Sequence, residues 1–212
     1  NVNVVVNNGT VSESSKTVHE GNNVTFNLTS TLSSYSTYVP VSCTNGQTGS
    51  VANDTLLVNN VTSDTTCTVT YSDAGSTVLY TDGTLIINEK VEDRDGNIAL
   101  HGTVVKEYLP LSNANAYVFT SQSNVLWYSQ RASIKRVEIG QEIHPTSTAY
   151  WFKGLNYLSS GEFTNLNTSS VTSMYMMFDD AGTNSSVATF ELTGLDDWDT
   201  SNVTNMEQLF SY

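Results

Sequence analysis

The three histidines of the sequence are the first residues to test for catalytic chemistry. His19, His101 and His144 lie far apart, and none has a serine elbow or a paired acid at motif spacing. A hydrolytic triad needs a nucleophile, a base and an acid that orients the base. We therefore expect structural or solvent-facing histidines and no enzymatic activity.

Acidic residues offer two possible metal sites. Asp93-Arg94-Asp95-Gly96-Asn97 has the opening pattern of a calcium loop, but the distal bidentate glutamate is missing, so we expect a tight turn. A second group of acids could form a recognition strip or a calcium site, and otherwise consists of solvated loop carboxylates: Asp179, Asp180, Asp196, Asp197 and Asp199. We favour the solvated loops and predict neither a metal nor a cofactor.

Cys43 and Cys67 are the only cysteines and lie 24 residues apart. Each falls within a predicted strand, and no further soft ligand accompanies them, whereas a zinc site needs four ligands. The pair predicts one disulfide, worth roughly 3 kcal/mol by the entropy of loop closure. Two buried free thiols are the alternative.

The first seventy residues have the pattern of a small β-module. Val2, Val4 and Val6 recur at every second position, and Val24, Phe26 and Leu28 do the same, which is typical of half-buried strands. Four short segments resemble, in their residues and their order along the chain, the divergent internalin B-repeat family: 9–12, 21–26, 41–47 and 60–69. This resemblance implies a spacer module of a bacterial surface protein and carries no catalytic residues.

The end of the chain contains an internal repeat. Thr168–Phe178 and Thr200–Phe210 share the pattern T-S-x-V-T-x-M-x-x-x-F at an offset of 32 residues, and Thr146–Phe152 is a degenerate copy 26 residues upstream of Thr172–Phe178. A repeated unit that cannot bury its own apolar stripe gains a core by stacking on its neighbours.

The residue types within each copy predict a short helix. Thr146, Thr172 and Thr204 stand at helix N-cap positions. The spacing i, i+3, i+4 places apolar residues on one stripe, with Phe152 as the counterpart in the first copy. The predicted repeat core is therefore Phe152, Met174, Met177, Phe178, Met206, Leu209 and Phe210.

These copies resemble the BspA-like leucine-rich-repeat family of bacterial surface proteins, over about residues 134–212. The predicted fold is β-rich and multidomain: a disulfide-closed β-module (1–72), a β-rich connector or N-terminal cap (73–140) and an α/β leucine-rich-repeat-like solenoid (141–212). We expect repeats to continue beyond Tyr212.

Composition and resemblance together predict the function. Charged residues make up only 14% of the chain, and acids outnumber bases by 21 to 8, which disfavours nucleic acid as a partner. No apolar stretch is long enough to enter a membrane. We expect a non-catalytic extracellular adhesin of a bacterial cell surface, which binds a host or neighbouring-cell protein or a matrix component. The alternative is a structural stalk or a phage-type fibre segment, and the oligomeric state stays open.

Overall fold

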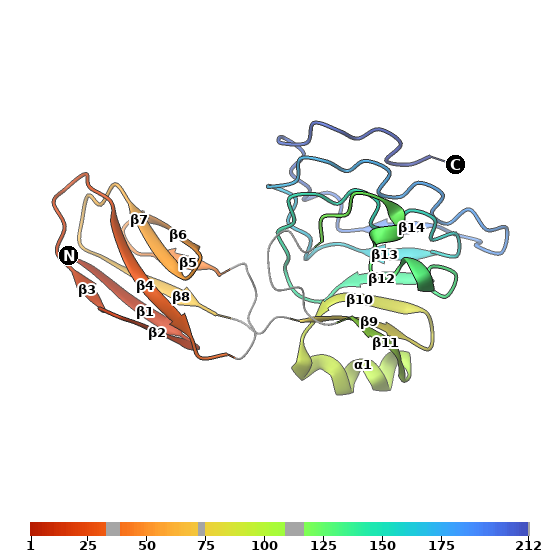
Figure 1. Ribbon diagram of the computed structural model, residues 1–212, viewed down its shortest axis with the longest axis horizontal. Coiled ribbons are helices and arrows are strands. Elements are labelled where there is room, and N and C mark those ends of the chain that lie inside the picture. The colour runs from red at the N-terminus through yellow and green to blue at the C-terminus, as the bar shows by residue number, and fades with distance from the viewer. Residues whose placement is uncertain (33–38, 72–74, 109–116, 212) are drawn as a thin grey trace. The chain divides into compact units, whose positions relative to one another are not determined.

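The computed structural model describes residues 1–32, 39–71, 75–108 and 117–211 (Figure 1). By their internal contacts the residues form two compact units, Asn1–Ala74 and Gly75–Tyr212. From Gly75 on, the predicted connector (73–140) and the predicted repeats (141–212) share one unit. In the described ranges every helix is too short or too polar to traverse a lipid bilayer.

The first unit consists of two four-stranded sheets. One has the strand order β3 (Ser15–Lys16), β1 (Val2–Asn7), β8 (Thr65–Thr70) and β5 (Val41–Cys43), in which only β1 and β8 pair in parallel. The other is antiparallel, with the order β2 (Gly9–Val11), β4 (Val24–Ser30), β7 (Thr55–Asn59) and β6 (Thr48–Ala52).

The alternating apolar residues of these strands fill the core of the first unit. Val2 and Val4 of β1 and Phe26 of β4 are buried, whereas the neighbouring Asn3 and Asn27 are exposed. Cys43 of β5 and Cys67 of β8 are register partners and form a disulfide, which confirms that prediction.

The second unit is organised by one six-stranded sheet. Its order is β11 (Val104–Tyr108), β9 (Ser76–Tyr80), β10 (Thr84–Glu89), β12 (Arg136–Ile139), β13 (Ser160–Glu162) and β14 (Glu191–Thr193). The first three strands are antiparallel, and β10, β12, β13 and β14 run parallel. Helix α1 (Arg94–His101) follows the 3-10 turn η1 (Val91–Asp93), and two further turns are η2 (Gln122–Asn124) and η3 (Tyr128–Gln130).

Three segments of the second unit stack on one another, and we call them rung 1 (residues 146–154), rung 2 (172–180) and rung 3 (204–211). Alternate N–H groups of one rung donate to carbonyls of the next. In rung 1 the N–H of Phe152 donates to the carbonyl of Met177 (2.9 Å), and in rung 2 the N–H of Phe178 donates to that of Leu209 (2.9 Å). Other N–H groups bond within their own rung, as that of Met177 does to Met174 (3.1 Å), and those of Thr172 and Thr204 donate to the preceding rung.

Aromatic rings fill the space between the sheet and the rungs. The rings of Phe152, Phe178 and Phe210 lie in sequence, with centroids 5.2 Å and 5.1 Å apart, and Phe163 contacts Phe152 (5.5 Å) and Phe178 (5.7 Å). Val137 and Ile139 of β12 face the same interior. The three copies thus share one core.

The predicted α/β leucine-rich-repeat solenoid is wrong. The chain is mostly β, in three sheets, and the single α-helix of the described residues lies upstream of the repeats. The backbone explains the error, because Tyr150, Met176 and Gln208 adopt left-handed φ values of 66°, 53° and 54° at the same place in each rung. A residue in that conformation interrupts a right-handed helix.

Two local expectations are also wrong. Asp95-Gly96-Asn97 lies within α1 and does not form a tight turn. Residues 117–130, in the connector that we expected to be β-rich, contain the turns η2 and η3 and no strand.

The stacked rings lead to the first prediction. Phe178→Ala should lower the free energy of unfolding by about 3–5 kcal/mol, because Phe178 is buried on both sides and leaves a cavity. Phe210→Ala is the matched control and should cost about 1–2 kcal/mol, because that side chain is 53% exposed. Denaturant unfolding measures both, and equal losses would contradict a shared core that closes over rung 2.

Candidate functional site

The candidate site lies on the outward face of the parallel strands. Ile86 of β10, Glu138 of β12 and Glu162 of β13 are register partners and form a row across the sheet. Val137 and Ile139, which flank Glu138 in sequence, turn to the opposite face and are buried. Side chains on this row are therefore held at fixed spacing by a rigid ladder, as is typical of recognition surfaces.

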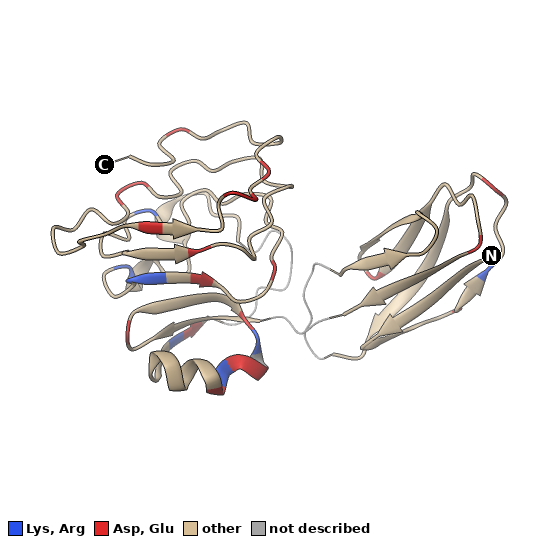
Figure 2. Ribbon diagram, turned by 180° about the vertical axis from the view of Figure 1, so that it is seen from behind, with Lys and Arg blue, Asp and Glu red and all other residues tan. Residues whose placement is uncertain are grey.

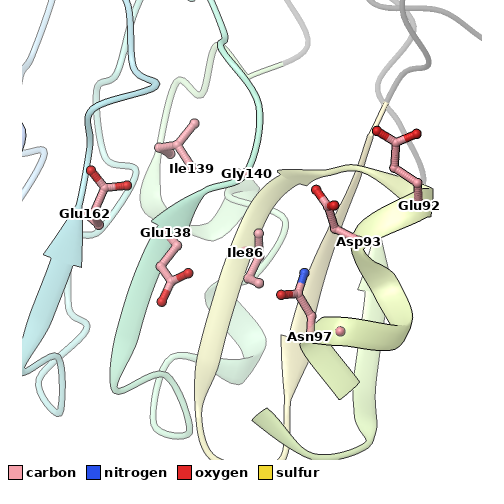
Figure 3. A pocket seen from close by; sticks show the side chains of 9 residues that line it. Ile86, Glu92, Asp93, Asn97, Glu138, Ile139, Gly140 and Glu162 are labelled. Atoms are coloured by element: carbon pink, nitrogen blue, oxygen red, sulfur yellow. The ribbon is translucent and has the colours of Figure 1, made fainter. Parts of the chain in front are cut away.

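A groove borders this row. It measures about 430 Å³, and its lining includes Ile86, Glu138 and Glu162 on one side and Asp93 and Asn97 on the other (Figure 3). In the close-up, Glu138 and Ile86 lie between Glu162 and the α1 residues. The groove presents carboxylate and amide groups, while its two isoleucines, Ile86 and Ile139, are almost fully buried.

A buried carboxylate holds α1 in place as the wall of the groove. Glu89, at the end of β10, is 1% exposed. Its oxygens accept hydrogen bonds from the Nε of Arg94 (2.5 Å), the Nδ2 of Asn97 (2.7 Å) and the hydroxyl of Tyr80. Burial, together with the bond to Glu89, raises the pKa of Tyr80. Arg94 also donates to Glu107 of β11 (2.9 Å) and lowers the pKa of that carboxyl.

The groove carries a negative charge surplus. Arg136 lies 3.6 Å from Glu138 and Lys90 lies 3.8 Å from Glu92, while the carboxyl of Glu162 accepts the N–H of Thr164 (2.9 Å). Figure 2 shows acidic segments at the start of α1 and on β12 and β13. In the described ranges, no three histidine, cysteine or acidic residues converge as a metal site. The arrangement favours a positively charged or hydrogen-bond-donating ligand.

A second, smaller groove of about 230 Å³ is lined by residues of the segments that precede the three rungs, among them Glu142, Asp197 and Asp199. His144 lies next to it, with its Nε2 3.1 Å from a carboxylate oxygen of Glu142. Burial lowers the pKa of His144 and outweighs the opposing effect of Glu142. This imidazole is therefore held in its neutral form near neutral pH.

The three threonines predicted as N-caps cap no helix. The Thr172 side chain and N–H both donate to the carbonyl of Thr146, and the same groups of Thr204 donate to that of Thr172. The structure thus brings Thr146, Thr172 and Thr204 into one ladder along the rungs. The prediction is wrong because the backbone donates to the neighbouring rung instead of turning into a helix.

The burial of the predicted core residues differs from rung to rung. Phe152, Met174, Met177 and Phe178 are buried, whereas Leu209 is half-buried and Met206 and Phe210 are exposed. The copies nevertheless lie in one stack, because rung 3 covers rung 2 and its own outer side faces solvent.

The titratable residues that the sequence singled out have different surroundings. His101 is buried, and its Nδ1 lies 2.9 Å from Asp82, whereas His19 is exposed. Asp179 is buried in an ion pair with Lys153 of rung 1, contrary to the expectation of a solvated loop acid. Asp180, Asp196, Asp197 and Asp199 are exposed.

Comparison with known proteins assigns only part of the chain. Residues 144–212, about a third of it, match a family described as "Mycoplasma protein of unknown function, DUF285". The matched segment begins at His144 and includes all three rungs. No curated protein and no solved structure matches the chain significantly.

The buried carboxylate leads to the second prediction. Arg94→Ala should destabilise the second unit by about 3–5 kcal/mol, because it leaves the Glu89 charge buried without its partner. Arg136→Ala should cost less than about 1 kcal/mol, because both members of the Arg136–Glu138 pair are solvent-accessible. Thermal unfolding of both variants tests this difference, and an Arg94→Ala protein as stable as Arg136→Ala would contradict the anchoring role.

The third prediction concerns pH. Because the pKa of His144 is lower in the folded chain, the unfolded chain binds its proton more readily as the pH falls through about 6.5. The contribution of His144 to stability is therefore complete above about pH 6.5 and is lost below it. His144→Asn should reduce the loss of stability between about pH 7.5 and pH 5.5 in denaturant unfolding, whereas His19→Asn should not. Identical pH profiles for all three proteins would refute this assignment.

Proposed function

We propose that this chain is an extracellular segment of a bacterial surface protein that binds a protein or another surface ligand without catalysing a reaction. The observation that carries the proposal is the pair of partly exposed carboxylates Glu138 and Glu162, which are register partners on the parallel ladder and line an acidic groove. A rigid ladder of this kind presents side chains at fixed spacing.

The family match supports the location. The family that matches residues 144–212 is associated with bacterial surface proteins. The resemblance of the repeated segments to the BspA-like family agrees with a location on the bacterial surface. The disulfide also supports an oxidising, extracellular compartment. The internalin B-repeat resemblance of residues 1–71 supports a spacer role for the first unit.

The charge of the groove supports a class of ligand. Four carboxylates (Glu92, Asp93, Glu138 and Glu162) line it, and the chain as a whole has a net charge of −13. Complementary charge favours encounter with a basic ligand and makes it sensitive to salt. We therefore propose a positively charged segment of a host, neighbouring-cell or matrix protein as the partner.

Binding by the full chain to a panel of purified matrix proteins tests the proposal and gives the fourth prediction. The double variant Glu138→Lys with Glu162→Lys should weaken binding at least about tenfold, because it replaces attraction in the groove by repulsion. Glu13→Lys with Glu20→Lys changes the net charge equally in the first unit and should leave binding unchanged.

Two outcomes would contradict the proposal. If both double variants lose binding to the same extent, the attraction comes from net charge and not from the groove. If no panel member binds the unmodified chain at any salt concentration, a structural stalk or fibre segment explains the chain better.

A further inference from the structure

The strands at the two ends of the first unit, β1 and β8, lie side by side and run in the same direction (Figure 1). They pair over six residues, from Val2 opposite Thr65 to Asn7 opposite Thr70. The chain reaches β1 at one end of this pair and leaves β8 at the other. The two ends of the first unit therefore lie at opposite ends of one parallel ladder.

This arrangement decides how the first unit responds to tension. A pull that separates the two ends of the unit acts on β1 and β8 in opposite directions along their length. The strands must then slide past each other, and all the hydrogen bonds between them are loaded at the same time. A pull on two neighbouring ends of the pair would instead open the bonds one after another. Resistance to force depends on this barrier, because forced unfolding is governed by the rate of unfolding.

Further hydrogen bonds extend the ladder beyond both ends of the strands. At the start, the N–H of Thr65 donates to the carbonyl of Asn1 (3.0 Å), and at the far end the N–H of Tyr71 donates to that of Asn7 (3.2 Å). The Nδ2 of Asn8 also donates to the carbonyl of Tyr71 (2.9 Å). Both ends of the sliding pair are thus closed by bonds that break only when the whole ladder moves.

Strand β8 is in turn fixed to the rest of the unit. On its other side it pairs with β5, where the disulfide joins Cys67 to its register partner Cys43. The side chains of Val2, Val69 and Cys67 are completely buried, so sliding would pull them through the core. Because β8 cannot be peeled from β5 while the disulfide is intact, tension falls on the contact between β1 and β8.

We propose that the first unit is a load-bearing element, in which the parallel pair of β1 and β8 resists tension applied between the two ends of the unit. The disulfide anchors β8 and keeps the 24-residue span between the cysteines, with β6 and β7, out of the stretched length. A spacer keeps its length under force only if it stays folded. The proposal concerns the first unit alone and does not depend on the function proposed for the groove.

Single-molecule stretching of the full chain between handles at Asn1 and the C-terminus tests the proposal and is the fifth prediction. A reductant identifies the unfolding step of the first unit. It should lengthen that step by about 80 Å, because cleavage of the disulfide releases 24 residues of roughly 3.3–3.6 Å each.

A second pulling geometry supplies the comparison. Handles at Asn1 and at Asp64, whose side chain is 80% exposed and precedes the start of β8, pull on neighbouring ends of the pair. The first unit should unfold at a force at least about twice as high in the end-to-end geometry, because six residue pairs then break together.

A matched pair of variants tests the ladder itself. The N–H of Val4 donates to Ser14 on the side of β3 (2.8 Å), so the N–H of Val5 faces β8 by alternation. Val5→Pro removes this donor at a side chain that is 49% exposed, and it should lower the end-to-end force by about a fifth or more. Val5→Ala keeps the donor and should leave the force unchanged.

Three results would each overturn the proposal: equal forces in the two geometries, the absence of any step that the reductant lengthens, or equal forces for Val5→Pro and Val5→Ala. If Val5→Pro prevents folding, its step is missing from every trace, and the comparison of the two geometries in the unchanged chain decides.

Discussion

The direction of the hydrogen bonds between rungs is the constraint on which the second unit depends. Left-handed residues at Tyr150, Met176 and Gln208 accompany a backbone in which alternate N–H groups donate toward the following rung, while the first N–H of rungs 2 and 3, at Thr172 and Thr204, donates to the preceding rung. The forward donors of rungs 1 and 2 are therefore satisfied only because a later copy supplies carbonyls. The copies are consequently held in order and in register, and neither a helix nor an isolated hairpin would meet the same need.

The stacking of the rungs also fixes which residues of the parallel strands face the core and which face outward. Strand β12, which precedes rung 1, and strands β13 and β14, which precede rungs 2 and 3, pair in parallel in the same order as the rungs stack. Val137 and Ile139 lie on the face of the sheet that packs against the interior, and Glu138 and Glu162 lie on the opposite face. The repeated apolar residues thus build the scaffold, while the residues on the outer face can vary in charge without disturbing the core.

The parts of this structure that the sequence predicted are those set by short-range pattern. Alternation placed Val2, Val4 and Phe26 in a β core, and the even cysteine count indicated the disulfide. The spacing of Met174, Met177 and Phe178 identified a buried stripe but not its backbone, because a helix and a turn-rich rung both bring residues three and four apart to one side. The groove escaped prediction, since Glu138 and Glu162 meet α1 only through the folding of distant segments.

The start of the rung stack follows the same hydrogen-bond rule. A carbonyl of rung 1 faces away from rung 2, and the indole N–H of Trp127 donates to it, at Trp151 (2.7 Å). This acceptor is thus covered by a side chain that can only donate, and the Trp127 ring adds apolar contact to Phe152.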